Sequence, residues 1–113
     1  MTVMIVEDNE LMRGLLRTLI KDVATTVSEV SDGSLALAAY AEHLPDWVLM
    51  DIRMEAMDGI EATRQIKTAY PNANIMIVTD YDDASLREAA RDAGASGYVV
   101  KENLLALREL LAT

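Results

Sequence analysis

Cysteine is missing from the 113-residue chain. This absence excludes disulfide bonds, zinc sites built from thiolates and enzymes that use a thiol nucleophile. A metal ion bound by this sequence would therefore need oxygen ligands or the single histidine, His43.

Basic residues and long apolar runs are scarce as well. The sequence has 10 Lys and Arg against 19 Asp and Glu, a net charge of -9 that repels phosphate backbones and anionic lipid, so direct nucleic-acid binding is not expected. No run approaches the ~20 apolar residues that span a membrane, and the acidic amino-terminal segment does not resemble a signal peptide. We therefore expect a cytoplasmic protein with no membrane partner.

What the sequence does contain is a regular alternation of short apolar runs and helical patterns. Four runs rich in Val, Ile and Met are typical of strands buried on both faces of a parallel sheet, at residues 3–6, 47–50, 75–78 and 98–100. The mixed segment 25–30 predicts an edge strand. A stretch with apolar residues at helical spacing follows each strand, the first one after a possible cap at Asn9. This order predicts one α/β domain over residues 1–113, a doubly wound sheet with helices on both faces.

Polar and charged residues follow four of these apolar runs. They are Glu7 and Asp8, Asp51, Thr79 and Lys101. Because the carboxyl ends of parallel strands meet at one edge of the sheet, we expect these side chains to converge there. Two carboxylates ~5 Å apart repel by about 3 kcal/mol at an effective dielectric of ~20, and one lysine cannot neutralise three of them. A Mg²⁺ ion, which prefers oxygen ligands, would remove the conflict.

Each of these residues also has an ordinary interpretation. Acids at strand ends are commonly solvated turn residues or favour the start of the next helix, and Lys101 could be a solvated rim charge. Taken together, these residues form a metal site beside an amine and a hydroxyl. Such a site is suited to phosphoryl transfer, in which a carboxylate attacks the phosphorus in line with the leaving group. Asp51, on the central strand, is the best candidate for the nucleophile.

Four segments, in this order, resemble the receiver domain of two-component response regulators: "IVEDNELMRGLLRTLI", "VLMDIRMEAMDGIEATRQIK", "IMIVTDYDD" and "AGASGYVVKENLLALRELL". The resemblance covers essentially the whole sequence. It implies a flavodoxin-like fold with five helices and a five-stranded parallel sheet of order 2-1-3-4-5. It also implies a signalling domain, rather than an enzyme, in which Asp51 accepts a phosphoryl group from a sensor histidine kinase or a histidine phosphotransfer protein.

The resemblance assigns a role to each residue at the strand ends. Lys101 would contact the phosphoryl group, Thr79 would hydrogen-bond one of its oxygens, and the ring of Tyr98 would then turn toward the core. Four residues would bind Mg²⁺ directly or through water: Glu7, Asp8, Asp51 and, through its backbone carbonyl, Arg53.

The resemblance also implies an output surface, formed by the fourth helix, the fifth strand and the fifth helix. Arg87, Arg91 and Arg108 lie there among acids, a mixture suited either to salt bridges in a homodimer or simply to a solvated face. "VTDYDD" and "GYVVKEN" are most similar to receivers that precede a C-terminal helix-turn-helix DNA-binding domain. Residues 1–113 contain no such domain, so we expect a truncated or single-domain regulator that controls transcription and reaches DNA only through another domain.

Three residues depart from the common receiver pattern. Asp80 stands where a small residue is usual and is expected to slow the entry of anionic donors. Glu55 replaces a frequent proline and is expected to loosen its loop. Glu102 also replaces a frequent proline, and because a cis bond before a non-proline residue costs ~3 kcal/mol, we expect a trans bond.

Other functions fit the pattern less well. Flavin and nucleotide binders need a glycine- or hydroxyl-rich phosphate loop after the first strand, where "EDNE" would repel a phosphate. An aspartyl-phosphate phosphatase usually carries a second acid two residues after its nucleophile, where Arg53 stands. A receiver-like adaptor that is never phosphorylated stays open, although such adaptors usually lack one of the residues present here. A phosphorylation assay separates these classes.

Overall fold

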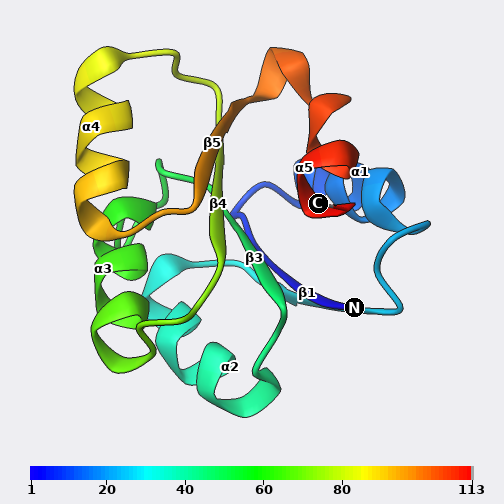
Figure 1. Ribbon diagram of the computed structural model, residues 1–113, viewed down its shortest axis with the longest axis horizontal. Helices are drawn as coiled ribbons and strands as arrows, with labels where there is room; N and C mark the ends of the chain where they lie inside the picture. Colours follow the sequence, from blue (N-terminus) through cyan, green and yellow to red (C-terminus); the bar gives the residue numbers. More distant parts are fainter. Residues whose placement is uncertain (113) are drawn as a thin grey trace.

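The computed structural model describes residues 1–112, which form a parallel sheet between two layers of helices (Figure 1). Every pair of neighbouring strands is parallel, and the order is β2-β1-β3-β4-β5, as the resemblance implied. The strands are β1 (Thr2–Val6), β2 (Thr26–Val30), β3 (Trp47–Met50), β4 (Ile75–Thr79) and β5 (Gly97–Val100).

Five α-helices connect or follow the strands within residues 1–112: α1 (Glu10–Ile20), α2 (Ala36–His43), α3 (Gly59–Ala69), α4 (Ala84–Ala93) and α5 (Ala106–Ala112). Short 3₁₀ turns precede α2 and α5, at Gly33–Leu35 and Lys101–Asn103. The predicted cap at Asn9 is confirmed, because its Oδ1 accepts a hydrogen bond from the Met12 amide at 2.9 Å. Among the residues described, none of the helices combines the length and the apolar character that a bilayer crossing requires.

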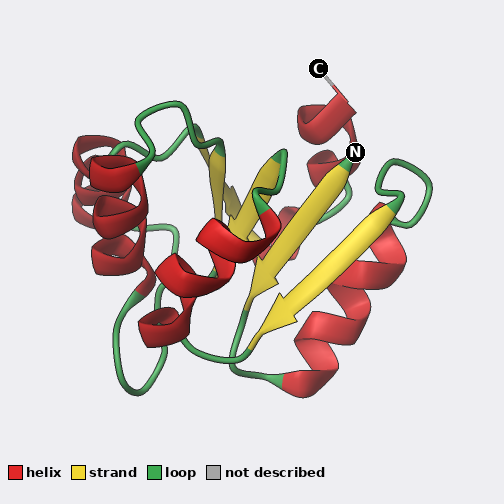
Figure 2. Cartoon of the chain, turned by 90° about the horizontal axis from the view of Figure 1, so that it is seen from below, coloured by secondary structure: helices red, strands yellow, loops and turns green. Residues whose placement is uncertain are grey.

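The sheet is covered on both faces (Figure 2). Met4 and Val6 of β1 face a cluster with α2, α3 and α4, whereas Val3 and Ile5 face α1 and α5. This alternation follows from the two-residue repeat of a strand, and it explains why the central strands are apolar along their length. The edge position of the 25–30 segment is confirmed as well, since β2 pairs only with β1 in the described sheet.

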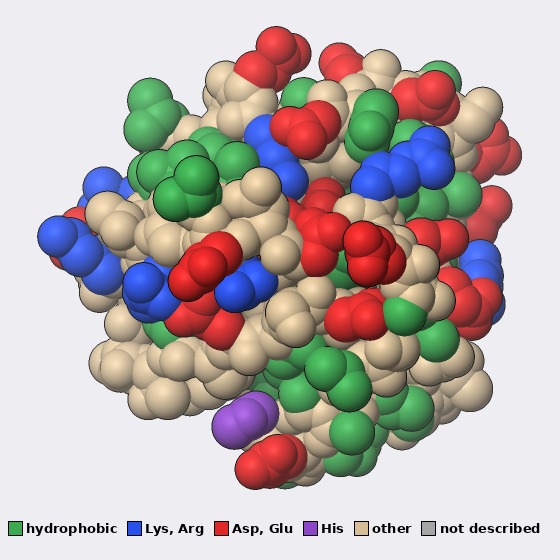
Figure 3. Space-filling model, turned by 180° about the vertical axis from the view of Figure 1, so that it is seen from behind, with side chains coloured by type: hydrophobic (Ala, Val, Ile, Leu, Met, Phe, Trp, Pro, Cys, Tyr) green, Lys and Arg blue, Asp and Glu red, His purple; other side chains and the backbone are tan. Residues whose placement is uncertain are grey.

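The surface of α2 is more apolar than its helical spacing suggested. Ala36 and Tyr40 are buried, but Leu35 and Leu44 at its two ends are more than half exposed. Figure 3 shows hydrophobic side chains (green) gathered on this part of the surface, next to the single histidine, His43 (purple). Apolar spacing alone therefore overestimates how much of this helix belongs to the core.

The register of the sheet aligns the strand ends that carry the charged residues. Val6 of β1 lies opposite Met50 of β3, and Thr79 of β4 lies opposite Val100 of β5. Glu7, Asp51 and Lys101 therefore leave the sheet at the same edge. The bond before Glu102 is trans, as expected, because residues 1–112 contain no cis peptide bond.

Candidate functional site

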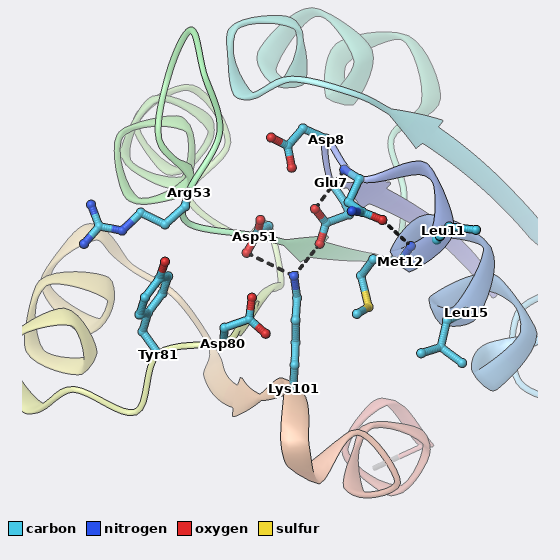
Figure 4. Close-up of a pocket in the computed structure, with 11 residues that line it drawn as sticks. Glu7, Asp8, Leu11, Met12, Leu15, Asp51, Arg53, Asp80, Tyr81 and Lys101 are labelled. Carbon is cyan, nitrogen blue, oxygen red and sulfur yellow. Dashed lines mark hydrogen bonds and ion pairs between the residues drawn. The ribbon is translucent and has the colours of Figure 1, made fainter.

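The carboxyl edge of the sheet opens into a cavity of about 350 Å³ (Figure 4). Five of the predicted site residues line it: Glu7, Asp8, Asp51, Arg53 and Lys101. These residues come from the ends of three different strands, β1, β3 and β5. Their side chains meet only because the strands are parallel. The convergence predicted from the sequence is therefore present for Glu7, Asp8, Asp51 and Lys101, whereas Thr79 lies outside the lining.

Three carboxylates form the centre of this site. One oxygen each from Glu7, Asp8 and Asp51 lies within 4.8 Å of the other two. Glu7 and Asp51 are buried, with 1% and 7% of their surface exposed, whereas Asp8 is exposed at the rim. At such separations two carboxylates repel by about 3 kcal/mol at an effective dielectric of ~20. The cluster thus stores a large electrostatic repulsion for a domain of this size.

Lys101 offsets part of this repulsion. Its Nζ lies 2.6 Å from Glu7 Oε1 and 3.6 Å from Asp51 Oδ1, and the second Glu7 oxygen accepts a hydrogen bond from the Asn9 amide at 3.1 Å. Burial lowers the pKa of Lys101, but the hydrogen bond from Lys101 to Glu7 and the charge of Asp51 outweigh it and raise that pKa overall. The ammonium is therefore protonated and directed into the acidic cluster.

Ionisation of Asp51 is unfavourable in this cluster. Burial, followed by the charge of Glu7, raises the pKa of Asp51 to about 7, and the opposing effect of Lys101 is smaller. Without a further cation, Asp51 is thus partly protonated near neutral pH. A bound cation would restore its charge, and the carboxylate would then be available as a nucleophile.

The donor set fits Mg²⁺. Three carboxylates against one ammonium leave two negative charges, which a divalent cation balances. Asp80 adds a further acid, because it lines the same cavity and its charge helps to raise the pKa of Lys101 (Figure 4). Oxygen ligands in this number, at an open cavity with room for water, suit Mg²⁺ better than a closed calcium cage.

Thr79 and Tyr98 lie outside the lining of this cavity. Thr79 is fully buried at the end of β4, and its Oγ1 accepts a hydrogen bond from the Tyr81 amide at 3.4 Å. The hydroxyl of Tyr98 donates to the Tyr81 carbonyl at 2.6 Å, and the guanidinium of Arg87 lies 4.5 Å from its ring centre. Both predicted switch residues are therefore connected to the loop between β4 and α4.

Several residues at the site were not predicted from the sequence. Leu11 and Leu15 belong to the helical pattern that follows the first predicted strand, but they line the cavity and Leu11 is 86% exposed. Tyr81 also lines it, with the Arg53 guanidinium 5.1 Å from its ring centre. The i, i+4 spacing of the two leucines shows only that they share a helix face, so no sequence signal distinguished a cavity wall from the core.

The family model for the response regulator receiver domain matches residues 3–112. This chain belongs to the response regulator receiver domain family. The expected resemblance is thereby confirmed, and the flavin-binding, nucleotide-binding and phosphatase alternatives lose their support. Receiver domains are signalling domains of two-component systems, and membership implies interaction with phosphodonors such as histidine kinases.

Individual relatives differ in how much of their length this receiver covers. The chemotaxis protein CheY of Halobacterium salinarum is 39% identical over 99 residues, which are 88% of this chain and 82% of that protein. Response regulator MprA of Mycobacterium sp. (strain KMS) is 36% identical over 110 residues, which are 97% of this chain but 47% of MprA. The chain thus spans about half the length of MprA.

Solved structures agree with the sequence comparison. The crystal structure of a two-component response regulator of the LuxR family from Aurantimonas sp. SI85-9A1 is 36% identical. It has a TM-score of 0.89, with 98% of this chain and 84% of that chain covered. This receiver therefore has the fold of response regulators, and transcriptional regulators such as DegU of Brevibacillus brevis, 34% identical, are among its relatives.

Proposed function

We propose that this receiver accepts a phosphoryl group on Asp51 from a phosphohistidine of a sensor histidine kinase or a histidine phosphotransfer protein. The observation that supports this most directly is the Asp51 carboxylate, buried at a cavity floor with Glu7, Asp8 and Lys101 around it. An Asp51 oxygen forms the new bond to phosphorus as the bond from phosphorus to the imidazole nitrogen breaks, and the electron pair of that bond stays with the imidazole.

Mg²⁺ would be held by Asp8, Asp51 and the backbone carbonyl of Arg53, with Glu7 contributing through water. When bound, the ion supplies positive charge at the oxygens of the transferring phosphoryl group. Lys101 Nζ, which donates to Glu7, lies 3.6 Å from Asp51 Oδ1 and supplies a second positive charge there. The carboxylate cluster, which repels itself when metal-free, thus becomes a site for a phosphoryl group.

Phosphorylation would act on the rest of the domain through the β4–α4 loop. A hydrogen bond from the Thr79 hydroxyl to a phosphoryl oxygen would draw this loop inward, because the Thr79 oxygen already accepts from Tyr81. That movement displaces the Tyr81 carbonyl, to which the Tyr98 hydroxyl donates, and frees the Tyr98 ring to turn toward the core. The two hydrogen bonds therefore link the acceptor site to β5.

The output surface would be formed by α4, β5 and α5. Of the three arginines expected on it, Arg108 pairs within the chain with Asp22 at 2.7 Å and so turns toward α1. Arg87 also pairs within the chain, with Asp82 at 2.9 Å, but it lies on α4 with Arg91, and both are candidates for contacts in a phosphorylation-dependent homodimer. Control of transcription would require a DNA-binding domain outside residues 1–113.

The proposed phosphotransfer is tested by intact mass spectrometry after incubation with acetyl phosphate, with and without Mg²⁺. We expect one phosphoryl adduct on the native chain that requires Mg²⁺, and none on the Asp51→Asn variant. Turnover of the donor without an adduct would indicate a phosphatase. Absence of both adduct and turnover, also with a phosphohistidine protein as donor, would favour the adaptor function instead.

A further inference from the structure

We infer that Arg13 is a positioning residue, which holds the segment from Glu7 to Asn9 in the geometry that binds a divalent cation. Arg13 lies on the first turns of α1 and does not line the cavity. This inference rests on the proposed magnesium site and concerns how the chain maintains that site when no cation is bound.

The guanidinium of Arg13 joins this segment to β2. Its Nη1 donates to the backbone carbonyl of Glu7 at 2.8 Å and to that of Asp8 at 3.3 Å. On its other side, Nε lies 3.3 Å from Oε1 of Glu29 in β2, and only 17% of the Arg13 side chain is exposed. A planar guanidinium, with several donors in fixed directions, suits such a bridge better than an ammonium.

These two carbonyls belong to the peptide groups on either side of the Asp8 Cα. Holding both peptide groups restricts the direction in which the Asp8 side chain leaves the backbone. Asp8 needs this restraint more than its neighbours, because the last ladder hydrogen bond of the strand is the one from the Glu7 amide to the Val30 carbonyl at 3.0 Å. Beyond that bond, Asp8 is exposed and is repelled by Glu7 and Asp51.

Charge and position predict opposite effects for this residue. As a cation near the acidic cluster, Arg13 weakens the attraction for Mg²⁺, so loss of its charge alone would tighten metal binding. As a restraint on Asp8, Arg13 strengthens Mg²⁺ binding. Loss of Arg13 would leave the Asp8 carboxylate free to move away from the other two carboxylates. The sign of the change in Mg²⁺ affinity therefore distinguishes the two roles.

Arg17 offers a matched control on the same helix. It lies one turn after Arg13 and also pairs with Glu29, through the other oxygen of that carboxylate. Within residues 1–112, Arg17 makes no hydrogen bond or ion pair with the segment from Glu7 to Asn9. The Arg17→Gln variant thus removes the same charge and one ion pair to Glu29, while the hydrogen bonds to the two carbonyls remain.

The test is the Mg²⁺ dissociation constant of the unphosphorylated chain, measured by isothermal titration calorimetry. Loss of a hydrogen bond that supports a metal-binding residue typically weakens metal affinity 10- to 100-fold. We therefore expect the Mg²⁺ dissociation constant of Arg13→Gln to rise about tenfold. Arg13→Lys keeps the charge but lacks the planar donor set, so it should also bind more weakly than the native chain. Arg17→Gln should bind as the native chain does or slightly more tightly.

Hydrogen exchange of the metal-free chain provides a second readout. The Asn9 amide, which donates to Glu7, should exchange faster in Arg13→Gln and at the native rate in Arg17→Gln. Unchanged or tighter Mg²⁺ binding by both Arg13 variants would overturn the inference while leaving the magnesium site intact. If Arg13→Gln fails to fold, the affinity of Arg13→Lys decides. Absence of Mg²⁺ binding by the native chain would overturn the proposed metal site, and the inference with it.

Discussion

The Gly59→Ala variant should lose about 3 kcal/mol of unfolding free energy, a large part of the stability of a small domain. A Cβ at this position would lie 1.7 Å from the Asp51 carbonyl oxygen and 2.7 Å from its carbonyl carbon. Both are backbone atoms, so no change of rotamer relieves the clash. The Gly59 amide also donates to the Ile52 carbonyl at 2.8 Å, which fixes the start of α3 against the segment that carries the acceptor. Urea unfolding followed by circular dichroism measures the loss.

Gly14→Ala is the control for this substitution. Gly14 lies within α1, and the nearest atom to an added Cβ is a side-chain nitrogen of Arg17 at 4.0 Å. Because alanine is favoured over glycine inside helices, this variant should gain about 0.5 to 1 kcal/mol. Equal stability of Gly59→Ala and the native chain would show that α3 does not begin in contact with the Asp51 backbone.

The Asp51→Asn variant, without metal, should be more stable than the native chain by on the order of 4 kcal/mol at about pH 8. The reason is the raised pKa of Asp51, about 7 against an ordinary value of 3.8, which burial and the charge of Glu7 produce. An ionised carboxylate is thus less favourable in the folded chain than in the unfolded one. Asparagine has a similar shape and carries no charge, so this cost disappears.

The direction of the pH dependence follows from the same shift. Between the ordinary pKa of 3.8 and about 7, the folded chain holds a proton on Asp51 that the unfolded chain releases. The native chain therefore loses stability relative to Asp51→Asn as the pH rises through this window, and the difference is full above it. Below about pH 4, ionisation of Asp51 should no longer make the unfolding free energies of the two chains differ.

Urea unfolding at several pH values, in the presence of a chelator, measures this difference. Asp92→Asn, an exposed position on α4, controls for the loss of one negative charge and should show little of the effect. Added Mg²⁺ should reduce the advantage of Asp51→Asn, because it stabilises the chain that binds it better. A constant difference between native and Asp51→Asn from pH 4 to 8 would contradict the account of Asp51.

Much of the fold is predictable because the central strands are buried on both faces. Continuous apolar runs identified β1, β3, β4 and β5, and the polar content of the 25–30 segment identified the edge strand. The strand order came from the family resemblance, since periodicity does not state which strands are neighbours. Helix spacing was less informative at Leu11, which is exposed and lines the cavity instead of packing in the core.

The candidate site was predictable where residues directly follow strands. Glu7, Asp51 and Lys101 are fixed by the register of a parallel sheet, so their convergence follows from the fold alone. The contacts of Arg13 and Tyr81 could not be predicted in this way. They depend on the path of irregular loops and on side chains of different elements, and neither leaves a periodic signal in the sequence.

The most direct measurement is the position of the phosphoryl group on the chain. Borohydride reduction converts an aspartyl phosphate into homoserine, which peptide mass spectrometry locates. After reaction with acetyl phosphate and Mg²⁺, we expect homoserine at position 51 and at no other acidic position. Homoserine at Asp8 or Asp80, or a stable phosphate on Thr79 or His43, would contradict the assignment of Asp51 as the acceptor.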